Sequence, residues 1–287
     1  MVALLQRELI PNIPLEKWVN SAIGWIIGNF GGFFDVLNSV IENVVNGLSG
    51  LLTSLPALLM IAILAVITYF LAGWRMTLFT VVGLFFVISL GLWNDTMLTL
   101  ALILVATTIC LVIGIPIGIL AAKSRGLEES IRPVLDLMQT MPAFVYLVPF
   151  VILLGLGAGP ALIATVIFAT PPAVRLTMLG IQQVPKETVE AAHAFGSTPM
   201  QTLFKVELPL SLGSIRAGVN QVIMLSLSMV VIAGLVGFEG LGKPVVEGLQ
   251  QLNVGLAFEG GIGIVVLAII LDRVTRGIGG GGTAKKA

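Results

Sequence analysis

Charged residues are scarce in this sequence: Asp, Glu, Lys and Arg make up only 10% of its 287 residues, against about 25% in an average soluble chain. The 15 basic and 15 acidic residues leave no basic excess, which excludes a protein that neutralises the phosphates of nucleic acid. Hydrophobic residues make up 57%, and the mean hydropathy is +1.06. A soluble fold could not bury this much apolar surface, so the composition predicts an integral membrane protein.

Cysteine and histidine occur once each. The single Cys110 lies in an apolar run, and one cysteine can form neither an intramolecular disulfide nor a multi-cysteine metal site. His193 has no neighbouring His or Cys of the kind that zinc needs. The sequence also lacks the Gly-x-x-x-x-Gly-Lys-Ser/Thr phosphate loop. We therefore expect no metal and no cofactor on this chain, and any ATP and magnesium must be bound by a partner.

Ionisable residues are missing from the middle of the long apolar stretches, where they usually mark proton or ion relays. Asp95, Lys123, Asp136 and Asp272 all fall in predicted loops or at the ends of predicted spans. This absence disfavours a proton-coupled carrier. No Ser/His/Asp set and no paired intramembrane carboxylates are available either, so we expect no catalytic residues and no enzyme activity.

Long apolar stretches are what the sequence does contain. A spanning helix needs about 20 mostly apolar residues, because the hydrocarbon core is about 30 Å thick and an α-helix rises about 1.5 Å per residue. Seven candidate spans are found at 56–73, 76–93, 98–122, 141–157, 160–180, 215–237 and 260–275. The sequence predicts an all-α polytopic membrane protein with a transmembrane domain at 56–276.

Residues 1–55 have a different character. Apolar residues recur at helical spacing in two stretches separated by Gly31 and Gly32, with Asp, Asn, Ser and Glu between them. This pattern predicts two amphipathic helices that lie on the outer membrane interface or pack against the spans. Their polar faces hold almost no Lys or Arg, so anionic lipid is not the expected anchor. The Gly-rich segment 277–287 is expected to be a flexible tail.

Orientation follows from the basic residues, because cytoplasmic loops carry an excess of Lys and Arg. Placing the 181–214 loop inside puts twelve basic residues on or near the cytoplasmic side and three outside. The inner group is Arg75, Lys123, Arg125, Arg132, Arg175, Lys186, Lys205, Arg216, Arg273, Arg276, Lys285 and Lys286, and the outer group is Arg7, Lys17 and Lys243. The opposite orientation would reverse this split. We therefore expect the amino terminus outside and the carboxyl terminus in the cytoplasm.

The 181–214 loop has the pattern of two short helices. Good helix formers run from Glu187 to Phe195, and Gly196 sits where a glycine in the left-handed conformation ends a helix. Thr198 is then a suitable N-cap, and Gln201 completes a Thr-x-x-Gln capping box around Pro199. The second helix is expected to stop before Pro209, which disfavours its continuation.

Small side chains in this helix-turn-helix allow close approach of a partner. Ala191, Ala192 and Gly196 supply them, and Glu190 offers a charge that a basic partner residue could meet. Such a short helix is suited to a groove in a partner protein. The bland alternative is an ordinary connecting hairpin.

A family resemblance is carried by the same residues. Their spacing resembles the signature E-A-A-x3-G-x9-I-x-L-P of the membrane subunits of ATP-binding-cassette importers. The matching residues are Glu190, Ala191, Ala192, Gly196, Val206, Leu208 and Pro209, and Val206 is the one departure, in place of isoleucine.

The resemblance extends along nearly the whole chain. Residues 139–149, 170–175 and 207–211 are similar to the glycine betaine and proline betaine permeases of this family. The resemblance implies a type I importer fold in a bacterial plasma membrane. It also implies two permease copies, two cytoplasmic ATPase subunits that bind ATP and magnesium, and an external binding protein that delivers the substrate.

Candidate substrate contacts are the aromatic residues Tyr146 and Phe150, one helical turn apart, which could meet a quaternary amine by cation–π contact. Packing against lipid or the protein core is the alternative for both. The substrate itself stays open, since another small solute such as an amino acid or choline would suit the same permease. A secondary carrier, a channel and a structural membrane subunit are the competing functions. A carrier should show an inverted repeat or a midplane charge, and neither is found.

Overall fold

The structure is a computed structural model that describes residues 14–279. Within this range there are helices but no strand, which confirms the all-α prediction. In chain order the elements are α2 (Leu15–Ser54), α3 (Ala57–Ala72), α4 (Trp74–Ser89), α5 (Trp93–Lys123), α6 (Arg125–Thr140), α7 (Ala143–Leu154), α8 (Ala158–Gln182), α9 (Lys186–Ala194), α10 (Pro199–Thr202), the π-helical turn η1 (Leu203–Glu207), α11 (Leu208–Ser228), α12 (Val230–Leu235), α13 (Gly242–Gln250) and α14 (Val254–Gly279). Arg7, Lys285, Lys286 and most of the predicted tail lie outside the described residues.

All seven predicted spans are helical, but they differ in length. Four helical segments are long and apolar enough to cross a membrane, namely Trp93–Lys123, Ala158–Gln182, Pro199–Leu235 and Val254–Gly277. The other three predictions correspond to α3 and α4, with 16 residues each, and α7, with 12. These helices are shorter than the roughly 20 residues that a straight crossing needs.

Two sharp corners precede the short helices α3 and α7. The axes of α2 and α3 meet at 98°, and those of α6 and α7 at 88°. In each case an extended residue, Leu55 or Met141, is followed by a proline, Pro56 or Pro142, that caps the next helix. A proline disfavours helical dihedrals at the residue before it and so ends the first helix. Counting each bent pair as one span brings the total to six.

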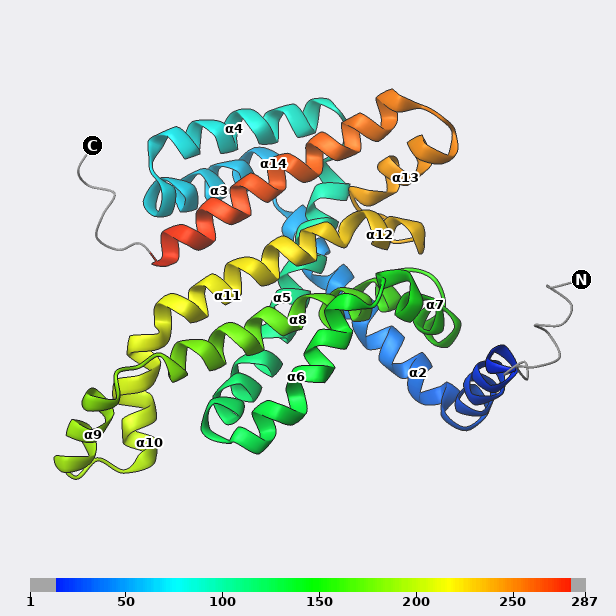
Figure 1. Ribbon diagram of the computed structural model, residues 1–287. Coiled ribbons are helices and arrows are strands. Elements are labelled where there is room, and N and C mark those ends of the chain that lie inside the picture. Colours follow the sequence, from blue (N-terminus) through cyan, green and yellow to red (C-terminus); the bar gives the residue numbers. More distant parts are fainter. Residues whose placement is uncertain (1–13, 280–287) are drawn as a thin grey trace, which may run out of the picture.

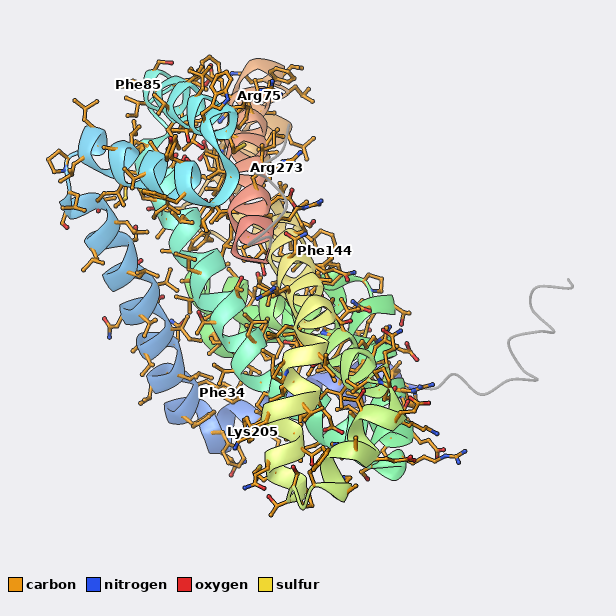
Figure 2. All side chains as sticks on the ribbon, turned by 90° about the vertical axis from the view of Figure 1, so that its left-hand side faces the viewer. Phe34, Arg75, Phe85, Phe144, Lys205 and Arg273 are labelled. Carbon is orange, nitrogen blue, oxygen red and sulfur yellow. The ribbon has the colours of Figure 1, made fainter. Side chains whose placement is uncertain are left out.

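Helix α2 differs from the prediction of two amphipathic helices. It is one helix of 40 residues that continues through Gly31 and Gly32. Its ribbon bends sharply near the labelled Phe34, so the glycines permit a kink in place of a break (Figure 2). The part of α2 nearest Ser54 packs on α5, α7 and α8 through the buried Ile41 and Val45.

Helices α5, α8 and α11 form the centre of the molecule (Figure 1). Glycines allow these helices to approach closely: a Cβ on Gly114 or Gly118 of α5 would lie 2.6 Å from an atom of α8. Gly180 of α8 faces α11 in the same way, with Ser214 Cβ at 2.8 Å. Close packing of small residues is how membrane helices associate, because lipid tails are as apolar as leucine and give no hydrophobic drive. Gly114 and Gly118 therefore serve the close packing of α5 on α8.

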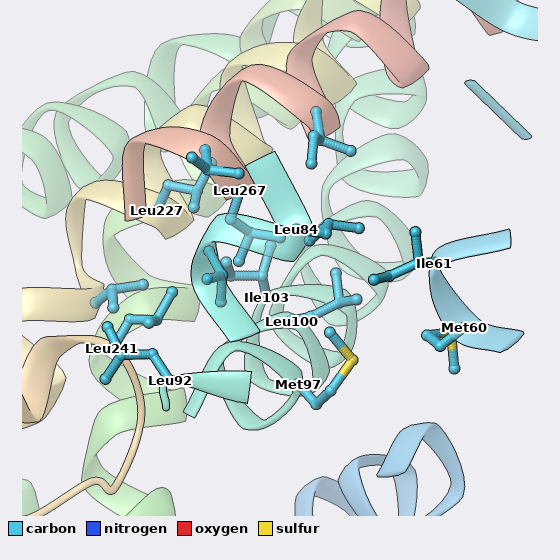
Figure 3. Close-up of a cluster of buried hydrophobic side chains, with 14 of the residues drawn as sticks. Met60, Ile61, Leu84, Leu92, Met97, Leu100, Ile103, Leu227, Leu241 and Leu267 are labelled. Carbon is cyan, nitrogen blue, oxygen red and sulfur yellow. The ribbon is translucent and has the colours of Figure 1, made fainter. Parts of the chain in front are cut away.

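A second layer of α3, α4 and α14 covers one flank of α5 and α11. Its contact with them is a cluster of buried aliphatic and methionine side chains drawn from all five helices (Figure 3). Leu84, Met97, Ile103, Leu227 and Leu267 are each no more than 4% exposed. The cluster fixes the positions of these helices around α5.

The two ends of the molecule carry different elements. Figure 1 shows the α9–α10 pair, the turn between α3 and α4, and the carboxyl end of α14 at the left, and α7 and α13 at the right. The predicted inner group of basic residues includes Arg75, Lys205 and Arg276 on the left-hand elements. Lys243, from the predicted outer group, begins α13 at the other end. These placements agree with a chain whose basic residues gather on one side.

Candidate functional site

The α9–α10 hairpin, defined as residues 186–202, projects beyond α8 and α11 at one end of the molecule (Figure 1). Its first helix ends as predicted, with Gly196 at φ +82°. The N–H of Gly196 donates to the His193 carbonyl at 2.9 Å, and the N–H of Ser197 donates to the Ala192 carbonyl at 3.1 Å. This is the Schellman arrangement, which satisfies the last carbonyls of a helix.

The second helix begins as predicted too. The Thr198 hydroxyl accepts from the backbone N–H of Gln201 at 3.3 Å, and the Gln201 side-chain oxygen accepts from the backbone N–H of Thr198 at 2.9 Å. Pro199 occupies the first turn, where its missing N–H costs nothing. Two closed caps back to back fix the turn between α9 and α10. The prediction of a helix-turn-helix is confirmed.

The end predicted for the second helix at Pro209 is wrong. Helix α10 continues through η1 into α11, and the helical segment Pro199–Leu235, with 37 residues, is long and apolar enough to cross a membrane. In η1 the N–H of Leu208 donates to the carbonyl of Leu203, five residues earlier. A π turn is wider than an α-helical turn, so the ring of Pro209, at the start of α11, has room beside the preceding carbonyl.

The residues of the hairpin are open to a partner. Glu190, Ala191 and Gly196 are exposed and Ala192 is half-buried, and α9 contains no buried residue. Beside them lie large apolar side chains that the protein itself leaves uncovered: Phe195 is 91% exposed, and Met200 and Phe204 are 64% and 60% exposed. An apolar patch of this kind at a polar rim marks an interaction surface.

The remaining signature residues lie where the hairpin joins α11. Val206 and Leu208 are half-buried and Pro209 is exposed. Between them, Glu207 is only 4% exposed, and its carboxylate oxygens lie against the Lys123 ammonium of α5, with Oε1 at 2.5 Å. The signature leaves position 207 open, and sequence reasoning gave Glu207 no partner.

Known proteins resemble this chain over most of its length. Residues 114–279 match the family described as binding-protein-dependent transport system inner membrane component. The chain belongs to this family. It is 48% identical over 267 residues to the glycine betaine/proline betaine transport system permease protein ProW of Escherichia coli K12, covering 93% of this chain and 75% of that one. It is 46% identical over 271 residues to the glycine betaine transport system permease protein OpuAB of Bacillus subtilis 168, covering 94% and 96%.

The permease fold is also found in a solved structure. An inward-facing crystal form of the MetNI methionine ABC transporter matches with a TM-score of 0.57 and 24% identity, covering 64% of this chain and 94% of that one. At this identity the match shows the fold alone. The family match shows that the chain is an inner membrane component of a binding-protein-dependent transport system.

Tyr146 and Phe150, the predicted substrate contacts, lie in α7 within one buried cluster of the permease. Tyr146 is 6% exposed, and its hydroxyl has no hydrogen-bond partner among residues 14–279. Phe150 packs against the same cluster and is partly buried. Their role in the substrate path stays a prediction.

An exposed stripe of small, polar and methionine residues on α11 was not singled out from the sequence. Its members are exposed and recur every three or four residues along one face of the helix: Gly213, Ala217, Gln221, Met224 and Ser228. The Ser228 hydroxyl donates to the Met224 carbonyl at 3.0 Å, whereas the Gln221 amide makes no hydrogen bond to any residue of 14–279. The 4-4-3-4 spacing was visible in the sequence, but only packing shows that α8 and α14 leave this face uncovered.

Proposed function

We propose that this permease carries glycine betaine or a related quaternary-amine osmolyte across the membrane, driven by ATP hydrolysis in two partner ATPases. The observation that carries the proposal is the α9–α10 hairpin: an exposed, doubly capped element with the importer signature spacing at one end of the molecule. Small side chains around Ala191 and exposed Phe195 and Met200 suit a groove in the ATPase.

The substrate class is supported by the relatives. They match almost the full length of this chain, and their names specify glycine betaine and, for one of them, proline betaine. Another small solute, such as choline or an amino acid, is the alternative. Both betaines join a quaternary nitrogen to a carboxylate, so a path for them needs hydrogen-bond donors as well as groups that tolerate a cation.

We infer that the complex contains two copies of this chain, two ATPases and an external binding protein. The α11 stripe supports pairing. An amide without partners in hydrocarbon costs on the order of several kcal/mol, so Gln221 must face protein or water. Two-fold symmetric pairs are the commonest homo-oligomers. Two copies with their stripes opposed would cover Gly213 and Ala217 by close packing and leave Gln221 and Ser228 beside a hydrated passage.

The proposed cycle is alternating access. Closure of the ATP-bound ATPases pushes on both hairpins, the helices rock from inward-facing to outward-facing, and hydrolysis with release resets them. ATP and magnesium belong to the partner subunits. The hairpin and the carboxyl terminus lie in the cytoplasm and the amino terminus outside, in keeping with the basic residues gathered on one side.

Reconstitution of the complete complex tests the function. Uptake of glycine betaine, proline betaine, choline, carnitine and an amino acid should require ATP, the ATPases and the binding protein, and the two betaines should compete best. ATP-independent uptake by the chain alone would favour a secondary carrier or channel instead. Preference for an amino acid would overturn the substrate class but keep the importer.

The passage is tested separately by single cysteines in a Cys110→Ala background. Gln221→Cys and Ser228→Cys should react with a small hydrophilic thiol reagent and lose the reaction when substrate saturates the complex. Val82→Cys, on the exposed face of α4, is the matched control and should stay unreactive in lipid. Equal reactivity at all three positions would contradict a passage along α11.

A further inference from the structure

We propose that the Lys123–Glu207 ion pair makes α5 move together with the hairpin. This inference rests on the proposed function of α9 and α10 in coupling to the ATPase. The pair is thus a positioning device for transport, in addition to the signature residues that face the ATPase. It joins residues 84 apart in the sequence and connects the last residue of α5 to the last residue of η1.

Among residues 14–279, the pair is a hydrogen-bonded side-chain link that the hairpin and η1 make to another helix, α5. Among the described residues, the other side-chain hydrogen bonds made by 186–207 stay within the hairpin, between His193 and Ser197 and between Thr198 and Gln201. The chain itself also connects the hairpin to the permease, through Pro185 into α8 and through η1 into α11, and both of these helices pack on α5. Glu207 adds a direct ionic contact with α5 at the point where the hairpin joins α11.

The π turn explains why this link affects the transmission of motion. Its hydrogen bonds span five residues, a wider and weaker arrangement than an α-helical turn, and such turns often mark hinges. Glu207 stands at the end of the π turn nearest the membrane-spanning part of α11. With Glu207 held by Lys123, bending at η1 stops there, and the motion passes into α5 and α11 together. Without the pair, η1 could absorb the motion.

The pair is built to stay closed. The Glu207 side chain is 6% exposed and the Lys123 side chain 46%, so the carboxylate has little access to water while the ammonium keeps some. A buried carboxylate deprived of its partner is strongly unfavourable. Both oxygens of Glu207 lie within reach of the same ammonium. The two helices therefore separate here only at high cost, and they behave as one body.

The α5 end of the pair is itself fixed. Lys123 is followed by Ser124, whose side chain caps α6 by accepting from the Leu127 N–H at 3.4 Å. Helix α6 is held to α8 by Arg175 and Asp136, at 2.6 Å, and by Gln182 and Glu128, at 2.9 Å. The corner between α5 and α6 thus forms a firm base for the pair.

The test uses the reconstituted complex of permease, ATPase and binding protein. Lys123→Met and Glu207→Gln each remove one charge, and the reversed pair Lys123→Glu with Glu207→Lys restores opposite charges. The matched control is Arg125→Met, which breaks the exposed Arg125–Glu129 pair beside the same corner. Four quantities are measured: ATPase bound, basal ATP hydrolysis, uptake per ATP hydrolysed, and the melting temperature.

We expect the single-charge variants to keep the ATPase bound and to hydrolyse ATP, while uptake per ATP falls about tenfold or more, because the buried pair is broken. The reversed pair should recover most of the uptake per ATP, and Arg125→Met should match the parent. Unchanged uptake per ATP in both single-charge variants would overturn the proposal. A second result would also overturn it: all four quantities fall together in the single-charge variants, and the reversed pair restores only the melting temperature. That result would show that the pair has a purely structural role.

Two further results keep the test decisive. If the single-charge variants do not reach the membrane, Lys123→Arg and the reversed pair are compared with the parent, and low uptake per ATP in the reversed pair then overturns the proposal. If the parental permease binds no ATPase, the proposed function itself fails. If the ATPase binds but uptake per ATP is the same with and without the ion pair, only the role of the pair is overturned, and the proposed function stands.

Discussion

The Thr99 hydroxyl of α5 accepts a hydrogen bond of 2.8 Å from the backbone N–H of Leu241, 142 residues further along the chain. The same hydroxyl donates to the Asp95 carbonyl at 2.7 Å, and both Thr99 and Leu241 are fully buried. A Cβ on the neighbouring Gly240 would lie 2.5 Å from the hydroxyl oxygen, so only glycine fits there. One threonine thereby fixes the entry to α13 against the start of α5.

Thr99→Val should lower the free energy of unfolding by about 1–3 kcal/mol, because the buried N–H of Leu241 loses its acceptor. Thr99→Ser keeps the hydroxyl and should lie much closer to the parent. Thermal unfolding of the detergent-solubilised permease measures both. Equal melting temperatures for the two variants would show that the hydrogen bond contributes nothing.

Gly118→Ala should destabilise the packing of α5 on α8. The added Cβ would lie 2.6 Å from the Val174 carbonyl oxygen and 2.7 Å from Thr177 Cβ, so the helices must move apart, at about 1–3 kcal/mol. Gly126→Ala in α6 is the control, since no atom lies within 4 Å of its Cβ position. The expected result is a lower melting temperature and lower yield for Gly118→Ala alone.

Gly196→Val should impair coupling. At φ +82° a β-branched residue is strained by about 1 kcal/mol or more, and its bulk would stand on the exposed face of the hairpin. Insertion and folding should be normal, because no neighbouring atom lies within 4 Å. Uptake should fall, together with the stimulation of the ATPase by loaded binding protein.

Gly196→Asn serves as the comparison for that variant, since asparagine tolerates positive φ. It should retain more of the uptake than Gly196→Val. If both variants transported at the parental rate, the left-handed turn would have no role in coupling.

Glu190→Lys should weaken binding of the ATPase without affecting stability. Glu190 is exposed and has no ion-pair partner within residues 14–279, so its charge is free for a basic partner group. An exposed pair contributes under about 1 kcal/mol, and salt screens it. The difference between parent and variant in ATPase affinity should shrink as salt rises, and a salt-independent difference would point to a steric cause.

Orientation is tested by labelling single cysteines in a Cys110→Ala background with an impermeant thiol reagent. Gln250→Cys, exposed at the end of α13, should react from outside intact cells. Glu187→Cys, exposed in α9, should react only after the membrane is opened. Labelling of position 187 in sealed cells would reverse the proposed topology.

Local rules predicted the hairpin well. The end of α9 at Gly196 and the start of α10 at Thr198 depend on neighbours within about five residues, and those rules are the same in any fold. The gathering of basic residues on one side followed from their positions relative to the predicted spans. Family resemblance then supplied the importer fold, which periodicity alone could not distinguish from other bundles of apolar helices.

The wrong predictions concern residues that usually end a helix but can also be accommodated inside one. Pro209 lacks an N–H in either case, but a π turn lets the helix pass through it. Gly31 and Gly32 bend α2 without ending it. The Glu207 partner and the open face around Gln221 were beyond sequence reasoning, because each depends on which distant helix packs beside α11.

The π turn at Leu203–Glu207 also limits how the chain can change in length. Deleting one residue from η1 would restore an ordinary helix, and the Pro209 ring would then meet a carbonyl of the preceding turn. Successive residues of an α-helix are rotated by about 100°, so a residue inserted into α10 would turn the whole hairpin by that angle, and Phe195 and Met200 would face another side. Substitutions between Gly196 and Pro209 are thus far easier to accommodate than insertions or deletions, which gives the nine-residue spacing of the signature a mechanical origin.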